Sequence, residues 1–228
     1  MADRLTIAAT THGRVLVRHP PSAGPWPALV GFHGYGENAG QMLARLQGIP
    51  GAESWLLVSV QALHWFYARD QQTVVACWMT REDRETAIAD NIRYVADVID
   101  AIAHAWPFTR LACAGFSQGV AMAYRTALHA GRGCHGILAL GGDIPPELKD
   151  ERRLAWPPVL VGRGRDDAFY DAARFDADVS FLRDRGALAA TEVFDGAHEW
   201  TPAFDARAGA FLAQIGGAPA AGAPAAVD

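Results

Sequence analysis

Short apolar runs alternate with longer segments of helical periodicity along most of the chain. Residues 84–106 have the clearest helical pattern, because their large apolar residues recur at steps of three and four and share one face. Pro107 follows this segment, which fits a helix that ends there. The other predicted helices are residues 120–129, 172–185 and 200–215, and the predicted buried strands are 28–32, 55–60, 111–115, 135–140, 158–162 and 190–194.

The order of these segments predicts the fold class. Strands that alternate with helices are typical of an α/β protein, with a mostly parallel central sheet covered by helices on both faces. Nearer the start, residues 5–9 and 15–18 predict a hairpin that turns at His12 and Gly13. We expect a single α/β domain over residues 1–216. Residues 217–228 contain almost only Ala, Pro and Gly and predict a disordered tail.

Composition and charge exclude several function classes. The 228 residues carry a formal net charge of −5 without a basic run, which argues against a nucleic-acid partner. No apolar run reaches the roughly 18 residues of a membrane helix, and the first residues lack the pattern of a signal peptide. The three cysteines have no metal-site spacing, and no phosphate-binding or dinucleotide motif occurs. We expect a cytoplasmic protein with no metal, cofactor or membrane partner.

A serine between two glycines marks the change from a strand pattern to a helix pattern. The stretch is GFSQG at residues 115–119, with Ser117 at its centre. Small residues two positions before and after a serine permit a tight turn that holds the hydroxyl above the sheet edge. The start of the following helix adds positive potential where an oxyanion would form. The alternative is a glycine-rich turn whose serine only caps the helix.

A serine nucleophile needs a base that follows it in this kind of fold. Three histidines follow Ser117 in the chain. His129 lies in the next predicted helix and His135 leads into a strand, whereas His198 lies in the loop between the last strand and the last helix. Such a loop reaches the carboxyl edge of the sheet, so we expect His198 to be the base.

The base in turn needs a carboxylate that orients its ring. Asp166 and Asp167 follow the strand at residues 158–162, and Asp143 follows the strand before it. Asp195 is close to His198 in sequence, which disfavours it. From the residues alone, Asp166, Asp167 and Asp143 remain candidates.

An oxyanion hole requires two backbone N–H groups. We expect one from Gln118, the residue after the serine. The other is expected from Tyr35, in the glycine-rich loop GFHGYGENAG at residues 31–40, which follows an earlier strand. His33 in this loop precedes the serine in the chain, and we interpret it as a structural residue that orders the loop.

With these segments, the sequence resembles the phospholipase/carboxylesterase family of the α/β-hydrolase superfamily, which includes acyl-protein thioesterases. The resemblance covers about residues 27–211 and is carried by HGYG at 33–36, GFSQG at 115–119, a Gly-x-x-Asp loop and a Gly-x-His near the end. It implies an α/β-hydrolase fold, Asp167 as the acid by its spacing from Gly164, and His198 as the base. Two departures are Arg163 where the family loop has a histidine, and residues 169–170 in place of an aliphatic-proline pair.

The resemblance implies hydrolysis of ester or thioester bonds of a small-molecule substrate through an acyl-enzyme. We expect an apolar pocket in which Trp78 and Phe169 contact the substrate. The alternatives are a non-catalytic ligand-binding protein of the same fold, and peptidase or perhydrolase chemistry on the same triad. The choice between ester and thioester, and between monomer and homodimer, stays open. Other aromatic residues expected near the predicted loops are Tyr35, Trp65, Phe66, Tyr67, Tyr170 and Trp200.

Overall fold

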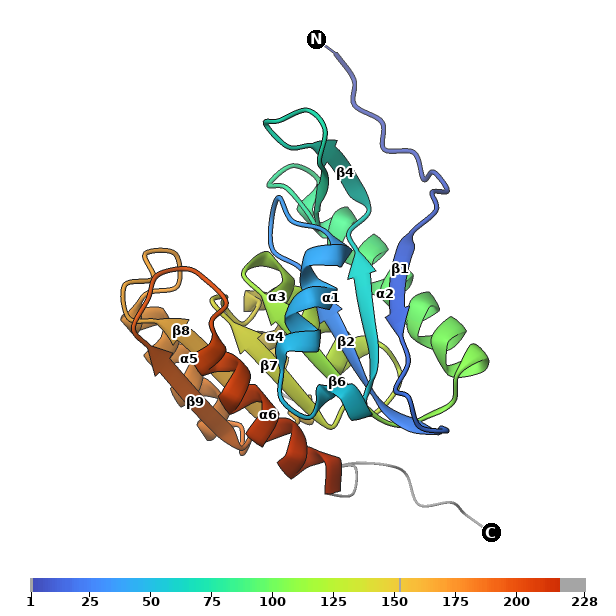
Figure 1. Cartoon of the computed structure of the whole chain (residues 1–228). Coiled ribbons are helices and arrows are strands. Elements are labelled where there is room, and N and C mark those ends of the chain that lie inside the picture. The colour runs from blue at the N-terminus through green and yellow to red at the C-terminus, as the bar shows by residue number, and fades with distance from the viewer. Residues whose placement is uncertain (1, 152, 218–228) are drawn as a thin grey trace.

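A seven-stranded sheet forms the centre of the protein (Figure 1). The computed structural model describes residues 2–151 and 153–217. The strand order is β1-β3-β2-β6-β7-β8-β9; β1 pairs with β3 in the antiparallel direction, and all other neighbours are parallel. The strands are β1 (Arg14–Arg18), β2 (Trp26–Phe32), β3 (Leu56–Gln61), β6 (Phe108–Phe116), β7 (Gly136–Leu140), β8 (Val159–Gly164) and β9 (Ala189–Phe194).

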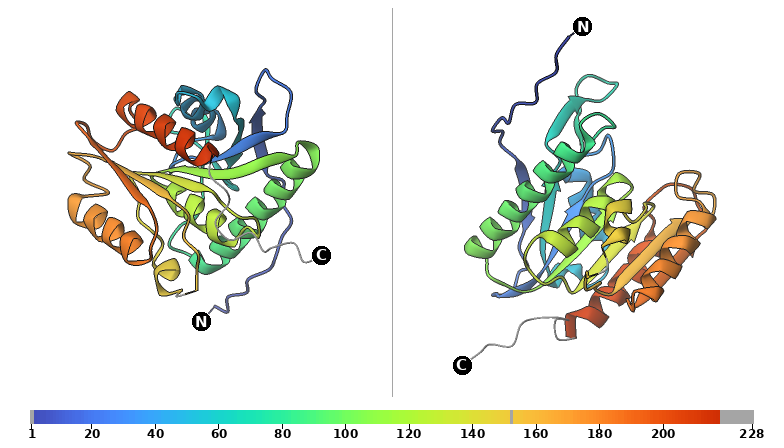
Figure 2. Two further views of the ribbon diagram at one scale, coloured as in Figure 1. Left: turned by 90° about the horizontal axis from the view of Figure 1, so that it is seen from below. Right: turned by 180° about the vertical axis from the view of Figure 1, so that it is seen from behind.

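Helices cover both faces of this sheet (Figure 2). The helices α1 (Ala39–Gly48) and α6 (Pro202–Gly217) pack on one face, and α2 (Arg84–Ala105), α3 (Gln118–His129) and α5 (Ala172–Asp184) pack on the other. Two short helices, η1 (Ala52–Ser54) and α4 (Pro146–Asp150), lie in connections. The predicted α/β class is confirmed, and the architecture is that of the α/β-hydrolase fold.

Burial on both faces explains why the inner strands are continuous apolar runs. Leu57 and Leu29 point to the α1 and α6 side, while Val58 and Val30 point to the α2 and α3 side, and all four are at most 2% exposed. Each such side chain contributes about 1.5–3 kcal/mol relative to an exposed one. The two apolar layers hold the strand ends firmly, so loops at the carboxyl edge start from a rigid base.

The predicted N-terminal hairpin is wrong. Residues 5–9 form no strand, and Leu5 and Ile7 are more than 80% exposed. The strand at 15–18 exists as part of β1, but it pairs with β3, with Val15 opposite Val60. The edge of the main sheet buries the apolar residues of β1, which residues 5–9 could not do in an isolated hairpin.

Five elements were absent from the sequence prediction: α1, η1, β4, β5 and α4. The helix α1 begins after Asn38, whose side chain accepts a hydrogen bond from the Gln41 N–H while the Gln41 side chain accepts from the Asn38 N–H. This capping box was the available signal for α1. The hairpin of β4 (His64–Tyr67) and β5 (Val74–Cys77) extends beyond the carboxyl end of the main sheet (Figure 1), and α4 follows β7.

The ends of the chain bear on two sequence expectations. The last helix α6 extends to residue 217, and residues 218–228, which make up nearly all of the predicted tail, lie outside the described residues. Within residues 2–151 and 153–217, none of the helices combines the length and the apolar character needed to cross a membrane.

Candidate active site

Ser117 lies at the sharp turn between β6 and α3. Its backbone has φ 53° and ψ −120°, a conformation that costs a non-glycine residue about 1–3 kcal/mol. The turn is held because the Ser117 N–H donates to the Leu140 carbonyl at 2.9 Å. A side chain at Gly119 would overlap the carbonyl oxygen of Phe32, and one at Gly115 would overlap the backbone of Gly119. Both glycines are therefore needed for α3 to start this close to the sheet.

A continuous hydrogen-bond chain connects Ser117 with His198 and Asp167. We name these three residues the catalytic wall, after the role that we propose for them below. His198 Nε2 is 2.8 Å from Ser117 Oγ, and His198 Nδ1 is 2.8 Å from Asp167 Oδ2. The second oxygen of Asp167 accepts the backbone N–H groups of Phe169 at 2.8 Å and Tyr170 at 2.9 Å. An ionised carboxylate only accepts, so Nδ1 carries a proton and Nε2 is free to take the serine proton.

Glycines let the three loops of the catalytic wall approach one another. Gly164 ends β8, and a side chain there would overlap the carbonyl oxygen of Ala197 in the loop that carries His198. Gly141 follows β7 with φ 69°, and a Cβ there would crowd the ring of His198 at about 3.1 Å. The loop that carries Asp167 and the loop that carries His198 can therefore lie this close together only because glycines stand where they come into contact.

Among the acidic candidates, only Asp167 reaches His198. Asp166 is exposed, Asp143 pairs with Arg174 at 3.3 Å, and Asp195 pairs with Arg165 at 2.9 Å. Asp167 reaches His198 because its side chain faces inward, where its other oxygen accepts two backbone N–H groups of the same turn.

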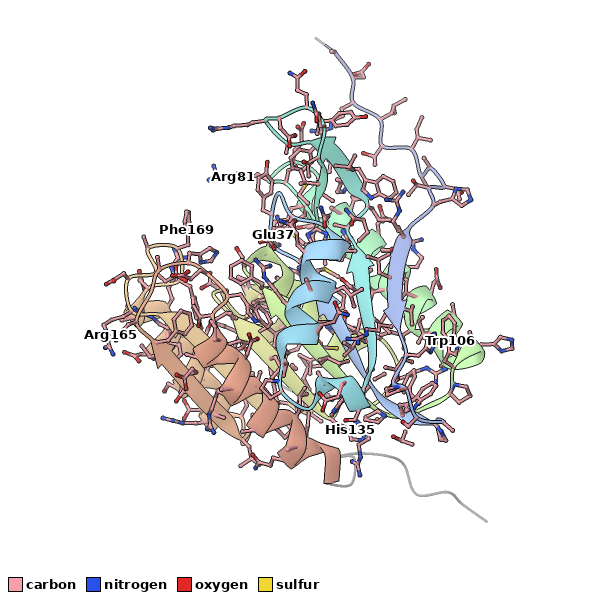
Figure 3. The ribbon with its side chains drawn as sticks, in the orientation of Figure 1. Glu37, Arg81, Trp106, His135, Arg165 and Phe169 are labelled. Atoms are coloured by element: carbon pink, nitrogen blue, oxygen red, sulfur yellow. The ribbon has the colours of Figure 1, made fainter. Side chains whose placement is uncertain are left out.

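The other two histidines that follow Ser117 lie elsewhere. His129 ends α3 near Glu151, and His135 accepts the backbone N–H of Leu111 at the start of the strands. Figure 3 shows His135 at the opposite end of the molecule from Phe169.

The loop after β2 is fixed by a partly buried ion pair and a buried histidine. Glu37 accepts the Gly34 N–H at 2.8 Å and binds both terminal nitrogens of Arg45 at 2.6 and 2.7 Å. Burial alone would raise the pKa of Glu37, but Arg45 outweighs it and lowers that pKa. His33 Nε2 accepts the Ala62 N–H at 3.1 Å, and burial lowers the pKa of His33, so this ring is neutral. These contacts agree with a structural role for His33.

The two expected oxyanion donors lie on fixed backbone. Tyr35 belongs to the loop held by Glu37, and among residues 2–151 and 153–217 no acceptor takes its N–H. Gln118 is the first residue of α3, where backbone N–H groups lack helical partners. Its side chain accepts the Trp78 N–H at 2.9 Å and donates to the Met79 carbonyl at 2.9 Å, which ties the loop after β5 to α3.

A cavity of about 270 Å³ opens beside Ser117 and His198. Phe169 is 73% exposed, lines this cavity, and has its ring centroid 5.0 Å from that of His198. Trp78 does not line the cavity, contrary to the sequence expectation. Its ring is fully buried below the loops, where its N–H donates to the His33 carbonyl at 2.9 Å. The complete lining is Met79, Arg84, Ser117, Gln118, Ala121, Arg125, Gly141, Gly142, Asp143, Ile144, Pro145, Pro146, Phe169, Tyr170 and His198.

Most of the other aromatic residues expected near the site also lie outside this lining. Tyr35, Trp65, Phe66 and Tyr67 are exposed around the β4–β5 hairpin, and the rings of Tyr35 and Phe66 are 5.7 Å apart. Glu37 belongs to the loop after β2 and Phe169 to the loop after β8. Figure 3 shows both residues at the same end of the molecule. Of the expected aromatics, Tyr170 lines the cavity, whereas Trp65, Phe66 and Tyr67 lie in strand β4. The sequence pattern could not indicate which rings face the cavity.

Two arginines in the cavity lining were missed by the sequence analysis. Arg84 begins α2 and Arg125 lies in α3, and Glu147 of α4 binds Arg125; we name these three residues the charged wall. Burial lowers the pKa of Arg125, although Glu147 partly compensates. No local motif marks these residues, because they come together only when three helices pack.

Comparisons with known proteins agree with this fold. The Bacillus cereus carboxylesterase superimposes with a TM-score of 0.71 at 15% identity, covering 89% of this chain and 94% of that one. Esterase PE8 gives 0.70 at 24% identity over 89% and 99%, and acyl-protein thioesterase 2 of Zea mays gives 0.68 at 17% over 90% and 100%. No curated protein sequence matches the chain. The phospholipase/carboxylesterase family model matches residues 20–213, and the chain therefore belongs to that family.

Proposed function

We propose that this protein is a serine hydrolase that cleaves carboxylic ester or thioester bonds of small molecules through an acyl-enzyme. The hydrogen-bond chain from Ser117 through His198 to Asp167 carries the proposal, because each link is 2.8 Å long and the serine borders a cavity. Membership of the phospholipase/carboxylesterase family supports the same reaction class.

The first step forms the acyl-enzyme. His198 Nε2 takes the proton from Ser117 Oγ as this oxygen attacks the substrate carbonyl carbon. The positive imidazole is stabilised by Asp167, whose carboxylate stays ionised. The tetrahedral intermediate then collapses, the bond to the alcohol or thiol breaks, and the leaving group receives the proton from His198.

The second step returns the enzyme to its starting state. Water gives a proton to His198 Nε2 and attacks the acyl carbon, and the bond to Ser117 Oγ breaks as that oxygen regains the proton. In both steps the N–H groups of Tyr35 and Gln118 are proposed to bind the negative oxygen. One such donor is worth about 3 kcal/mol in comparable enzymes.

The size of the cavity supports a small substrate. About 270 Å³ is at the lower end of the volumes of ligand pockets, so a long acyl chain would extend past Phe169 into solvent. We propose a short-chain ester or thioester as the partner of this site. A panel of esters, thioesters and peptide amides of matched acyl length separates esterase, thioesterase and peptidase chemistry.

Labelling with a fluorophosphonate probe tests the proposal directly. The wild-type protein should add one probe, detected by intact mass at Ser117, and Ser117→Ala should add none. Ser180→Ala removes an exposed serine of α5 and is the matched control, which should label like wild type. A wild-type protein that neither labels nor hydrolyses any ester in the panel would favour a non-catalytic binding protein instead.

A further inference from the structure

The charged wall holds more positive than negative charge next to the reacting groups. Arg84 and Arg125 line the same cavity as Ser117 and His198, and Glu147 is the carboxylate bound to them. Asp143 also lines the cavity, but Arg174 pairs with it at 3.3 Å and neutralises it. One positive charge of the wall is therefore unbalanced.

The contacts show which arginine is free to bind a ligand. Arg125 is 1% exposed and donates from Nε and Nη2 to one oxygen of Glu147, at 2.9 and 2.6 Å. Its third nitrogen, Nη1, faces the sulfur of Met79 at 3.9 Å. Arg84 is 44% exposed, and its nearest approach to Glu147 is 3.7 Å, which is too long for a hydrogen bond. Within residues 2–151 and 153–217 no acceptor takes a hydrogen bond from the Arg84 side chain, while Arg125 is a fixed charge behind it.

Neighbouring acids do not remove this surplus from the cavity. Glu82 and Asp83 precede Arg84 in the chain, but both turn away from the cavity and bind Arg4, at 3.1 and 2.6 Å. A guanidinium with free donors beside a second, buried guanidinium is a favourable site for an anion, because its hydrogen bonds to a carboxylate are charge-assisted and the buried charge adds to the attraction. The unbalanced charge of one matches a carboxylate monoanion better than a phosphate dianion.

We propose that Arg84, supported by Arg125, determines specificity by binding a carboxylate of the substrate. The preferred substrate is then a small ester that carries a free carboxylate, such as a half-ester of a short dicarboxylic acid. This inference rests on the proposed function for the reacting bond, but it concerns a separate part of the cavity. The cavity volume of about 270 Å³ fits a substrate with a short spacer between ester and carboxylate.

Binding to the Ser117→Ala variant tests the inference without turnover. Calorimetry compares monomethyl glutarate, a monoanion at neutral pH, with dimethyl glutarate, its neutral counterpart. We expect the monoanion to bind about tenfold more tightly, and the ratio to fall to about twofold when Arg84→Gln is added. The preference should also shrink in 0.5 M salt, because Arg84 is partly exposed.

Arg93→Gln is the matched control for this experiment. Arg93 lies in the same helix, is 70% exposed and pairs with Asp90 outside the cavity, so its removal should leave the ratio of the two affinities unchanged. Equal binding of the two glutarates, or a preference that survives Arg84→Gln, overturns the inference.

Turnover by the wild-type protein separates this inference from the proposed function. The ratio of kcat/KM for monomethyl over dimethyl glutarate should drop about fivefold or more in Arg84→Gln, in line with the binding data. Hydrolysis of both esters with an unchanged ratio would sink the carboxylate site and leave the serine hydrolase intact. Binding that discriminates, with no hydrolysis of either ester, would sink the hydrolase and leave the carboxylate site.

Discussion

The catalytic wall and the charged wall each contribute two residues to one cavity, but they are held together by different interactions. In the catalytic wall every polar group has a partner at hydrogen-bond distance, and its three residues come from loops at the carboxyl edge of the sheet. The charged wall comes from three helices and contains two guanidiniums for one carboxylate. Under the two proposals the walls have separate roles: the loops supply the reacting groups, and the charge imbalance selects the substrate.

Breaking the catalytic wall at its acid should have the largest effect. Asp167→Asn keeps the shape of the side chain but no longer holds the proton of His198 on Nδ1, so we expect kcat on a short-chain ester to fall about 10⁴-fold. Asp166→Asn is the matched control, since Asp166 is exposed and adjacent, and its kcat should stay within about twofold of wild type. A large loss of kcat in Asp166→Asn with little loss in Asp167→Asn would identify Asp166 as the residue that orients His198.

Breaking the charged wall at its carboxylate should mainly affect stability. Glu147→Gln leaves the buried Arg125 without a negative partner, and we expect the free energy of unfolding to fall by about 2 kcal/mol. The value is below that of a fully buried pair because Glu147 is 37% exposed. Urea denaturation measures it, with Asp90→Asn in the exposed Arg93 pair as a control that should change stability by less than about 0.5 kcal/mol. An equal loss of stability in both variants would contradict the view that Glu147 compensates the buried charge of Arg125.

Loosening the loop after β2, next to the catalytic wall, should reduce kcat without affecting substrate binding. Glu37→Gln weakens the attachment of this loop to Arg45 and, through Gly34, the position of the Tyr35 N–H. We expect kcat to fall about tenfold while KM changes less than twofold, because a misplaced oxyanion donor weakens transition-state binding. A change confined to KM would argue against this positioning role.

Titration of His33, the buried histidine of the same loop, should have the smallest effect, a change in stability with pH. The folded pKa of His33 lies below its ordinary value of 6.5, because burial disfavours the charged ring. The unfolded chain then binds the proton more readily, so stability is complete above about 6.5 and decreases as the pH falls below it.

Urea midpoints at pH 5.5 and pH 7.5 measure this dependence. The loss toward pH 5.5 should be smaller in His33→Asn, while His135, whose pKa is also lowered by burial, continues to contribute. An identical loss in wild type and variant would show that His33 does not titrate in this range.

The sequence predicted the turn at Ser117 and the loop of His198 correctly, because both follow from short motifs and from the order of elements along the chain. A serine between two glycines at a strand-to-helix junction predicts a tight turn, and Gly115 and Gly119 have the close backbone contacts that such a turn requires. Chain order selected His198 over His129 and His135, and parallel strands bring their following loops to one edge. The family resemblance, now confirmed, was needed to choose Asp167 over Asp166.

Other expectations failed where the answer depended on contacts between distant segments. The apolar residues of 5–9 resembled a strand, but β1 found its partner in β3, more than forty residues away in the chain. Trp78 belongs to a loop at the site, yet its indole N–H donates to the His33 carbonyl and its ring lies below the cavity. A hydrophobicity pattern indicates that a ring is buried, but not against which neighbour.

By itself the sequence determined the α/β class, the tight turn at Ser117 and the loop that carries His198, because periodicity, glycine spacing and chain order can be read along the chain. Tertiary structure alone decided that the ring of Trp78 lies below the cavity, and that Arg84 and Arg125 meet beside one carboxylate. Those outcomes depend on how helices and loops pack across a twisted sheet, and the energy of a buried charge depends on everything that surrounds it.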